Sequence, residues 1–397
     1  MSLSDPPVAP QAPTRTRWLV VLVLIGCGVV AAAHIGKVAP AIPTLKDELG
    51  IDDLAAGIML ASISVAAALF AYPLGRYLRR FEPSRVLVIA LLWLASLSIA
   101  GAGFTQALPI LVTRAAESIG YLVVVLIVPS LLRATAAVPD RRYVMALWGT
   151  FMPIGAGLAL FAAPALLSRW GWQSLWVASG LACVVIAVAV QALSPTLTAS
   201  SADAAEEVGD LSTLRGDLIR LAAIFGLYAA TWLAVLGLLP TALYEAGASL
   251  RFASMMTGLA VVLNAPGNFV AAHLARQGVP PRRVVTIGAS GIAISSWAIY
   301  ADHGWTALVI LGAVVFSFIS GFIPASLFGE LNRVGDPRLV PTATGALVQG
   351  SGVGQLLGPP ALVGVLLAAG GGSLAGPAVI TVTALLIILL ASRLRAS

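Results

Sequence analysis

Long apolar runs separated by short polar stretches dominate this sequence. A helix needs about 20 apolar residues to cross a bilayer. The first run, from Trp18 to about Ala41, is longer than the core of a signal peptide, so we expect an uncleaved spanning helix. Eleven further runs lie near 53–79, 84–104, 108–134, 141–168, 172–193, 218–244, 251–276, 283–301, 305–330, 340–368 and 374–393. The pattern predicts an all-α membrane protein with 12 transmembrane helices.

Polar segments divide these runs into two six-helix halves. We expect a proline-rich cytoplasmic tail at 1–17, an N-terminal half at 18–193 and a C-terminal half at 218–393. A cytoplasmic linker at 194–217 would join the halves, and a short tail at 394–397 would follow. The linker is acidic, with Asp203, Glu206, Glu207 and Asp210.

Composition excludes several classes of protein. Charged residues make up 10% of the chain and hydrophobic residues 59%, whereas a soluble domain carries about 25% charged residues. Alternating strands typical of an outer-membrane barrel are missing. No phosphate-binding loop, metal cluster or nucleotide-binding domain is apparent, so we expect neither an enzyme nor a cofactor or metal. The high content of arginine and alanine is typical of a bacterial protein.

The net charge of +6 invites the idea of a nucleic-acid partner, but its distribution favours another explanation. If the N-terminus is cytoplasmic, most lysines and arginines fall in cytoplasmic segments, and Lys46, Arg169 and Arg251 fall in outer loops. This asymmetry follows the positive-inside rule. We therefore predict that both termini are cytoplasmic, in a bacterial inner membrane, and that no nucleic acid binds.

The two halves repeat each other at an offset near half the chain. Residues 83–89 (PSRVLVI) match 281–287 (PRRVVTI). Pro129, followed by Arg133 and Asp140, corresponds to Pro324, followed by Glu330 and Asp336. Repeated halves around a site at the bilayer midplane are a hallmark of secondary transporters.

Several motifs resemble the major facilitator superfamily over nearly the whole chain. They are RAAESIG at 114–120, RWGWQSLW at 169–176, GSGVGQLLGPP at 350–360 and the segment after the second span, with Gly75, Arg79, Arg80, Glu82 and Arg85. The resemblance implies that this last segment is a cytoplasmic gate motif. Arg79 stands where the family has an acidic residue, and Glu82 or Asp140 is a candidate to replace it.

Two further segments, 36–45 (GKVAPAIPTL) and 147–155 (LWGTFMPIG), are most similar to the cyanate/nitroimidazole-permease-like branch of that superfamily. The family resemblance also implies a central cavity lined by the first and fourth spans, with transport by alternating access. The branch resemblance does not identify a substrate.

Four ionisable residues of the first and fourth predicted spans are functional candidates, because a charge inside the bilayer costs about 3 kcal/mol or more. His34 and Lys37 are three residues apart in the first span, and Arg114 and Glu117 are three apart in the fourth. Lys37 and Arg114 fall at comparable depth, which would make the cavity electropositive and suited to a small anion. His34 or Glu117 is a candidate proton carrier. The alternatives are a structural Arg114–Glu117 pair, a Lys37 reaching the headgroups, and a buried polar His34.

Aromatic and amide residues are candidates to complete a binding site. They are Trp148 in the fifth span, Tyr228 and Trp232 in the seventh, Asn264 and Asn268 in the eighth, and Gln355 in the eleventh. Packing is the alternative for the aromatic residues. Interhelical hydrogen bonding is the alternative for the amides.

From these features we expect a monomeric secondary transporter that takes up a small organic or inorganic anion, coupled to protons. Efflux of drugs or metabolites is the alternative, which the aromatic positions favour. A membrane sensor without flux is a third possibility, and the lack of a signalling domain argues against it.

Overall fold

The regular structure of the protein, seen in a computed structural model, is helical throughout the described residues. These are residues 13–51, 53–197, 215–300, 305–334, 336–368 and 374–394, and no strand occurs among them. The four acidic linker residues named above lie outside the described ranges. Ten helical segments in these ranges are long and apolar enough to cross a membrane. The prediction of an all-α membrane protein is confirmed.

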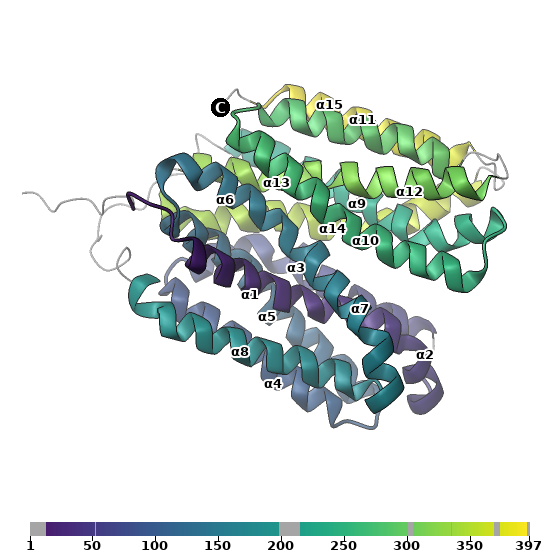
Figure 1. Cartoon of the computed structure of the whole chain (residues 1–397), viewed down its shortest axis with the longest axis horizontal. Helices are drawn as coiled ribbons and strands as arrows, with labels where there is room; N and C mark the ends of the chain where they lie inside the picture. The colour runs from purple at the N-terminus through teal and green to yellow at the C-terminus, as the bar shows by residue number, and fades with distance from the viewer. Residues whose placement is uncertain are drawn as a thin grey trace, which may run out of the picture.

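The N-terminal half contains ten helical elements. They are α1 (Trp18–Gly36), α2 (Val38–Leu49), α3 (Asp53–Leu78), α4 (Pro83–Ala102), α5 (Ala107–Thr135), η1 (Val138–Asp140), α6 (Arg141–Leu147), η2 (Trp148–Thr150), α7 (Phe151–Trp170) and α8 (Gln173–Leu197). Figure 1 shows this half in purple to teal, with α4 and α8 on the side away from the other half.

The C-terminal half occupies the green to yellow part of Figure 1. Its elements are α9 (Arg215–Glu245), α10 (Leu250–Arg276), α11 (Pro281–Tyr300), α12 (Thr306–Ser320), α13 (Phe322–Glu330), η5 (Leu331–Arg333), η6 (Pro337–Leu339), α14 (Val340–Ala368) and α15 (Ala375–Ser392). Helices α11 and α15 pack together on the outer side of this half.

Three of the predicted spans are broken helices. The first continues past Ala41 to Leu49 with a break at Lys37, the fifth contains the 3-10 turn η2, and the tenth breaks at Gly321. A proline lies in the first turn after each break, at Pro40, Pro153 and Pro324. Proline has no N–H group, so it cannot bond the carbonyl four residues earlier. The apolar pattern continues through each proline, which is why it predicts unbroken spans.

The two halves meet along α3 and α14 on one side, and along α6, α7 and α10 on the other. Glycines bring the backbones together at the first contact. A Cβ atom on Gly352 would lie 2.6 Å from the Ala68 nitrogen, and one on Gly75 would overlap the Pro341 carbonyl. Small residues allow this close approach of membrane helices. The seam between the halves is therefore tightly packed at these positions.

Candidate functional site

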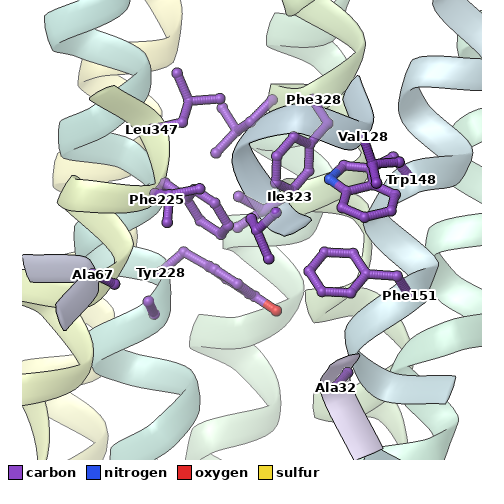
Figure 2. Close-up of a cluster of buried hydrophobic side chains, with 14 of the residues drawn as sticks. Ala32, Ala67, Val128, Trp148, Phe151, Phe225, Tyr228, Ile323, Phe328 and Leu347 are labelled. Atoms are coloured by element: carbon purple, nitrogen blue, oxygen red, sulfur yellow. The ribbon is translucent and has the colours of Figure 1, made fainter. Parts of the chain in front are cut away.

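A cavity of about 80 Å³ lies on the seam between the halves. It is lined by residues of α1, α3, α5 and α7 from one half and of α9, α10, α13 and α14 from the other. Figure 2 shows Phe225 and Tyr228 on one side of this region and Trp148 and Phe151 on the other. The cavity is therefore built where relative movement of the halves would reshape it.

Aromatic rings in contact with one another form much of the cavity wall. Phe225 lies 6.0 Å from Tyr228 between ring centroids and 5.6 Å from Phe328. Trp148 is fully buried behind the wall and stacks on Phe151 at 4.2 Å. Offset or edge-on contacts of this kind hold aromatic rings in fixed orientations. Trp148 therefore supports the lining and is not part of it.

Four of the predicted binding residues line the cavity, namely Tyr228, Trp232, Asn264 and Gln355. The indole N–H of Trp232 is buried and has no hydrogen-bond partner in the described structure. A buried donor without a partner costs about 1–3 kcal/mol. A solute with an acceptor oxygen at this point would remove that cost.

Asn264 and Asn268 belong to a buried hydrogen-bond network beside the cavity. The Asn264 amide donates to the hydroxyl of Ser320 at 2.9 Å and to that of Tyr228 at 3.4 Å. Asn268 donates to Asn264 Oδ1 at 2.8 Å and does not line the cavity. The network holds Asn264 and the Tyr228 hydroxyl in place, as interhelical bonding of buried amides does.

The lining described for this cavity contains no lysine, arginine, histidine, aspartate or glutamate. This corrects the expectation that Lys37 and Arg114 would make the cavity electropositive by lining it. Their depth was read from the spans, but their direction around the helix axis depends on packing. In this structure both side chains point into the N-terminal half.

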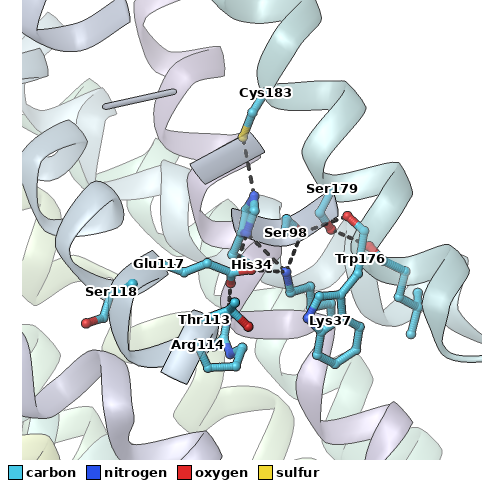
Figure 3. A network of polar contacts seen from close by, with 12 residues as sticks. His34, Lys37, Ser98, Thr113, Arg114, Glu117, Ser118, Trp176, Ser179 and Cys183 are labelled. Atoms are coloured by element: carbon cyan, nitrogen blue, oxygen red, sulfur yellow. Dashed lines mark hydrogen bonds and ion pairs between the residues drawn. The ribbon is translucent and has the colours of Figure 1, made fainter. Parts of the chain in front are cut away.

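The four ionisable residues converge on one buried site behind the cavity, between α1, α4, α5 and α8 (Figure 3). Lys37 Nζ donates to Glu117 Oε1 at 3.0 Å and to Ser98 Oγ at 2.7 Å. Arg114 donates to Glu117 Oε2 from the preceding turn of α5. All three charged side chains are at most 2% exposed. We call His34, Lys37, Arg114 and Glu117 the charge cluster.

His34 completes the charge cluster. Its Nδ1 atom lies 3.2 Å from Lys37 Nζ and 3.3 Å from Glu117 Oε2, and its Nε2 atom lies 3.3 Å from Cys183 Sγ. The ring thus sits between an ammonium donor and a carboxylate acceptor. A proton on Nδ1 would favour the contact with Glu117, and its absence would favour the contact with Lys37.

The geometry bears on the alternatives for these residues. Arg114 does pair with Glu117, and Lys37 is bonded inside the protein rather than extended to the headgroups. With Lys37 and Arg114 protonated and Glu117 ionised, the cluster has two positive charges and one negative charge. It adjoins the cavity, because Ile35 follows His34, Tyr121 follows Glu117 by one turn, and both Ile35 and Tyr121 line the cavity.

Three residues that contact the charge cluster are not predicted from the sequence as parts of a site. Ser98 donates to the Trp176 carbonyl at 2.7 Å, and the Trp176 ring lies 4.8 Å from Lys37 Nζ. Cys183 contacts His34. Serine, tryptophan and cysteine are ordinary residues in a membrane helix, so no local signal marks them.

Charged residues join the halves at the end predicted to be cytoplasmic. Arg142 donates to the Val279 carbonyl at 2.9 Å and lies 3.9 Å from Glu330, which is buried. Asp140 lies 3.8 Å from Arg276 across the seam. Arg133 also donates to a carbonyl of the other half, that of Val334. The seam is closed at this end.

The predicted gate motif is only partly at the seam. Gly75 accepts a hydrogen bond from Thr342 at 3.4 Å, and Arg80 lies over the Tyr77 ring. Glu82 instead caps α4, accepting from the N–H of Ser84 and of Arg85. Of the two candidates to replace the acidic residue at Arg79, it is Asp140 that pairs across the seam.

Comparisons with known proteins agree with this architecture. The sequence model of the Major Facilitator Superfamily matches residues 23–241. A search of curated protein sequences found no match.

Solved structures with similar folds are transport proteins at low identity. The human organic anion transporter MFSD10 (TETRAN) superimposes with a TM-score of 0.74 at 17% identity, over 94% of this chain and 98% of that one. The proton:xylose symporter XylE, bound to 6-bromo-6-deoxy-D-glucose, gives 0.73 at 14% identity, over 94% of each chain. FucP in the outward conformation gives 0.71 at 15%, over 94% and 98%. These likenesses concern the fold.

Proposed function

This chain belongs to the major facilitator superfamily, whose members are transporters, and we propose that it moves a small solute by proton-coupled alternating access. The observation that carries the proposal is the cavity on the seam, lined from both halves and closed at the cytoplasmic end. Rocking two halves about a central site exposes that site to each side in turn. The cavity is where such a solute would bind.

We propose that Tyr228, Trp232, Asn264 and Gln355 contact the solute. The unpartnered N–H of Trp232 supports this, because it needs an acceptor. Gln355 is bonded to Ser64 of the other half at 2.9 Å, so a solute bonded to this amide would act on a contact between the halves. Asn268 and Trp148 would position these residues from behind.

We propose the charge cluster as the site of proton coupling. A proton arriving at Glu117 would leave Lys37 and Arg114 without their counter-charge in a buried site, where unpaired ions are costly. The cluster would therefore have to rearrange α1 relative to α5. Both helices line the cavity through Ile35 and Tyr121, which gives a route from protonation to the shape of the solute site.

The substrate class that we propose first is a small organic or inorganic anion, moved inward. The excess positive charge of the cluster, one helical turn behind the cavity lining, supports it through its field rather than through contact. Efflux of drugs or metabolites is the second candidate, favoured by the uncharged aromatic cavity wall.

We also propose that the protein works as a monomer in a bacterial inner membrane with both termini in the cytoplasm. The distribution of lysine and arginine supports this orientation. The residues that join the halves at the closed end, including Arg142 and Arg276, would then lie on the cytoplasmic side.

The test uses purified protein in proteoliposomes loaded with a pH-sensitive dye. Anions, neutral solutes and lipophilic cations are added in turn, with and without an imposed pH gradient. We expect an anion to accumulate with proton entry in the wild type. In Glu117→Gln we expect solute exchange to persist while gradient-driven accumulation is lost. Glu82→Gln removes a carboxylate that caps α4 and is the matched control.

Each part of the proposal has its own contrary outcome. Accumulation by Glu117→Gln equal to that of the wild type would remove the cluster from coupling. Transport of cations or neutral drugs alone would favour efflux of drugs or metabolites over uptake of an anion. Binding without any flux in either direction would mean that this chain acts as a sensor.

A further inference from the structure

A second hollow, of about 1020 Å³, runs along the outer surface of α9 and α14 next to α3. Its lining shares no residue with the central cavity. The lining includes the small residues Ala222, Gly226 and Gly350. It also includes two larger residues, Ile219 and Leu357, which are 61% and 59% exposed. We call this the α9–α14 groove.

Close helix packing produces the groove. A Cβ atom on Gly226 would lie 2.9 Å from the Gly350 carbonyl oxygen, so α9 and α14 touch through their backbones. The contact is bordered by the larger side chains of Leu227 and Val353. Small residues at the contact and larger ones beside it leave a trough on the lipid-facing surface.

The groove has the length of one bilayer leaflet. Its lining runs along α9 from Arg215 to Ala230, which is about 22 Å at the rise of an α-helix. Half of a bilayer with its headgroups measures about 20–22 Å. The apolar part of the lining therefore covers the depth of an acyl chain.

A basic residue lies at one end of the groove, at the start of α9. Arg215 lines the groove at the start of α9 and is exposed. The next cation on the helix, Arg220, is paired with Asp217 at 2.9 Å. Among the described residues, Arg215 has no such acidic partner. It is placed to meet a phosphate at the level of the headgroups.

We propose that the α9–α14 groove binds one anionic phospholipid of the cytoplasmic leaflet, with an acyl chain over Ala222 and Ala230 and the phosphate at Arg215. The choice of leaflet depends on the proposed orientation. A bilayer-facing apolar trough selects lipid over a water-soluble solute, and the arginine selects an anionic headgroup.

The bound lipid would contact both halves of the protein. Tyr72 of α3 belongs to the groove lining, and its backbone N–H donates to Gln349 of α14 at 3.0 Å. This bond lies on the seam that closes the cytoplasmic end. The lipid therefore binds the closed arrangement, which contains the whole groove, more tightly than an arrangement in which α3 has moved away.

The experiment measures lipid binding directly. Delipidated protein in detergent is titrated with phosphatidylglycerol or phosphatidylcholine while the melting temperature is followed. A phosphatidylglycerol with a photoreactive acyl chain is then crosslinked and mapped by mass spectrometry. We expect phosphatidylglycerol to stabilise more strongly, and crosslinks to fall on α9 between Ile219 and Ala230 and on α14 near Val353.

Two variants and a control separate the parts of the proposal. Arg215→Ala should weaken phosphatidylglycerol binding about fivefold, the effect of one basic residue near an anionic surface. Ala223→Phe, at an exposed lining position, should remove the crosslinks. Arg283→Ala removes an exposed cation at the start of α11 and should change neither. If Ala223→Phe does not fold, Arg215→Ala and the crosslink map still decide.

Three results would overturn the proposal. The first is equal stabilisation by the two lipids. The second is an Arg283→Ala effect as large as that of Arg215→Ala, because this would indicate general attraction of charge. The third is crosslinking of residues 198–214 in place of α9 and α14, because the linker would then be the occupant.

Discussion

Lys37 Nζ lies 3.0 Å from Glu117 Oε1, and both side chains are buried where α1 meets α5. The ion pair sits behind the central cavity and inside the N-terminal half. Glu117 is also paired with Arg114 and with His34, and it is the single carboxylate of the cluster. Removing different members of the cluster should therefore have unequal consequences.

Glu117→Ala should destabilise the protein far more than Lys37→Met. The first variant leaves two cations buried without a counter-charge, and breaking a buried pair in this way costs about 3–5 kcal/mol. The second leaves Arg114 paired with Glu117. Thermal unfolding in detergent measures the difference. Equal melting temperatures for the two variants would mean that water or a rearrangement stabilises the two cations that Glu117→Ala leaves unpaired.

Trp232→Phe should weaken solute binding while leaving the fold intact. Phenylalanine keeps an aromatic ring at this lining position but lacks the indole N–H, which is buried without a partner in the described structure. Loss of one hydrogen bond should cost about 0.5–1.5 kcal/mol, or up to about tenfold in affinity. Solute-induced thermal stabilisation measures it. Trp170→Phe, at an exposed position on α7, is the control, and an equal loss there would contradict the assignment.

Glu330→Gln should open the closed end of the seam more than Asp140→Asn does. Glu330 is 2% exposed and lies near Arg142 and Arg333, whereas Asp140 and Arg276 form a partly exposed pair at 3.8 Å. Exposed pairs contribute about 0–1 kcal/mol. Labelling of cysteines introduced at the seam should rise more in Glu330→Gln. The reverse order would place the main latch at Asp140.

Gly352→Val should abolish transport by separating α3 from α14. The added side chain would collide with the backbone of Ala68, whose nitrogen lies 2.6 Å from a Cβ atom at this position. Gly237→Ala on α9 has open space around it and should raise stability by about 0.5–1 kcal/mol. Flux and melting temperature are measured for both. Full transport by Gly352→Val would show that this contact is dispensable.

The number and order of the spanning helices are readable from the sequence because a bilayer imposes a simple length and polarity rule. The sequence also contains Pro40, Pro153 and Pro324, but the apolar pattern does not predict the helix breaks next to them. A proline breaks a membrane helix only where neighbouring groups satisfy the freed carbonyl. The sequence contains the proline and not its neighbours.

The charge cluster shows the same division. Spacing along each helix was enough to pair His34 with Lys37 and Arg114 with Glu117, because residues three apart share a face. The direction in which each face points depends on how the helix is rotated about its axis. In the structure these faces point toward α4 and α8, where Ser98, Trp176 and Cys183 contact Lys37 and His34.

The sequence by itself determined that this chain is a 12-helix membrane protein in two related halves, with few charged residues and with four ionisable residues gathered in two spans. Apolar length and the cost of burying charge are local properties, so they can be read along the chain. Only the tertiary structure decided that the described lining of the central cavity contains no charged residue, that the four ionisable residues form one cluster behind it, and that Asp140 rather than Glu82 pairs across the seam. Those features depend on how helices distant in sequence rotate and pack against one another, and no local pattern specifies that rotation.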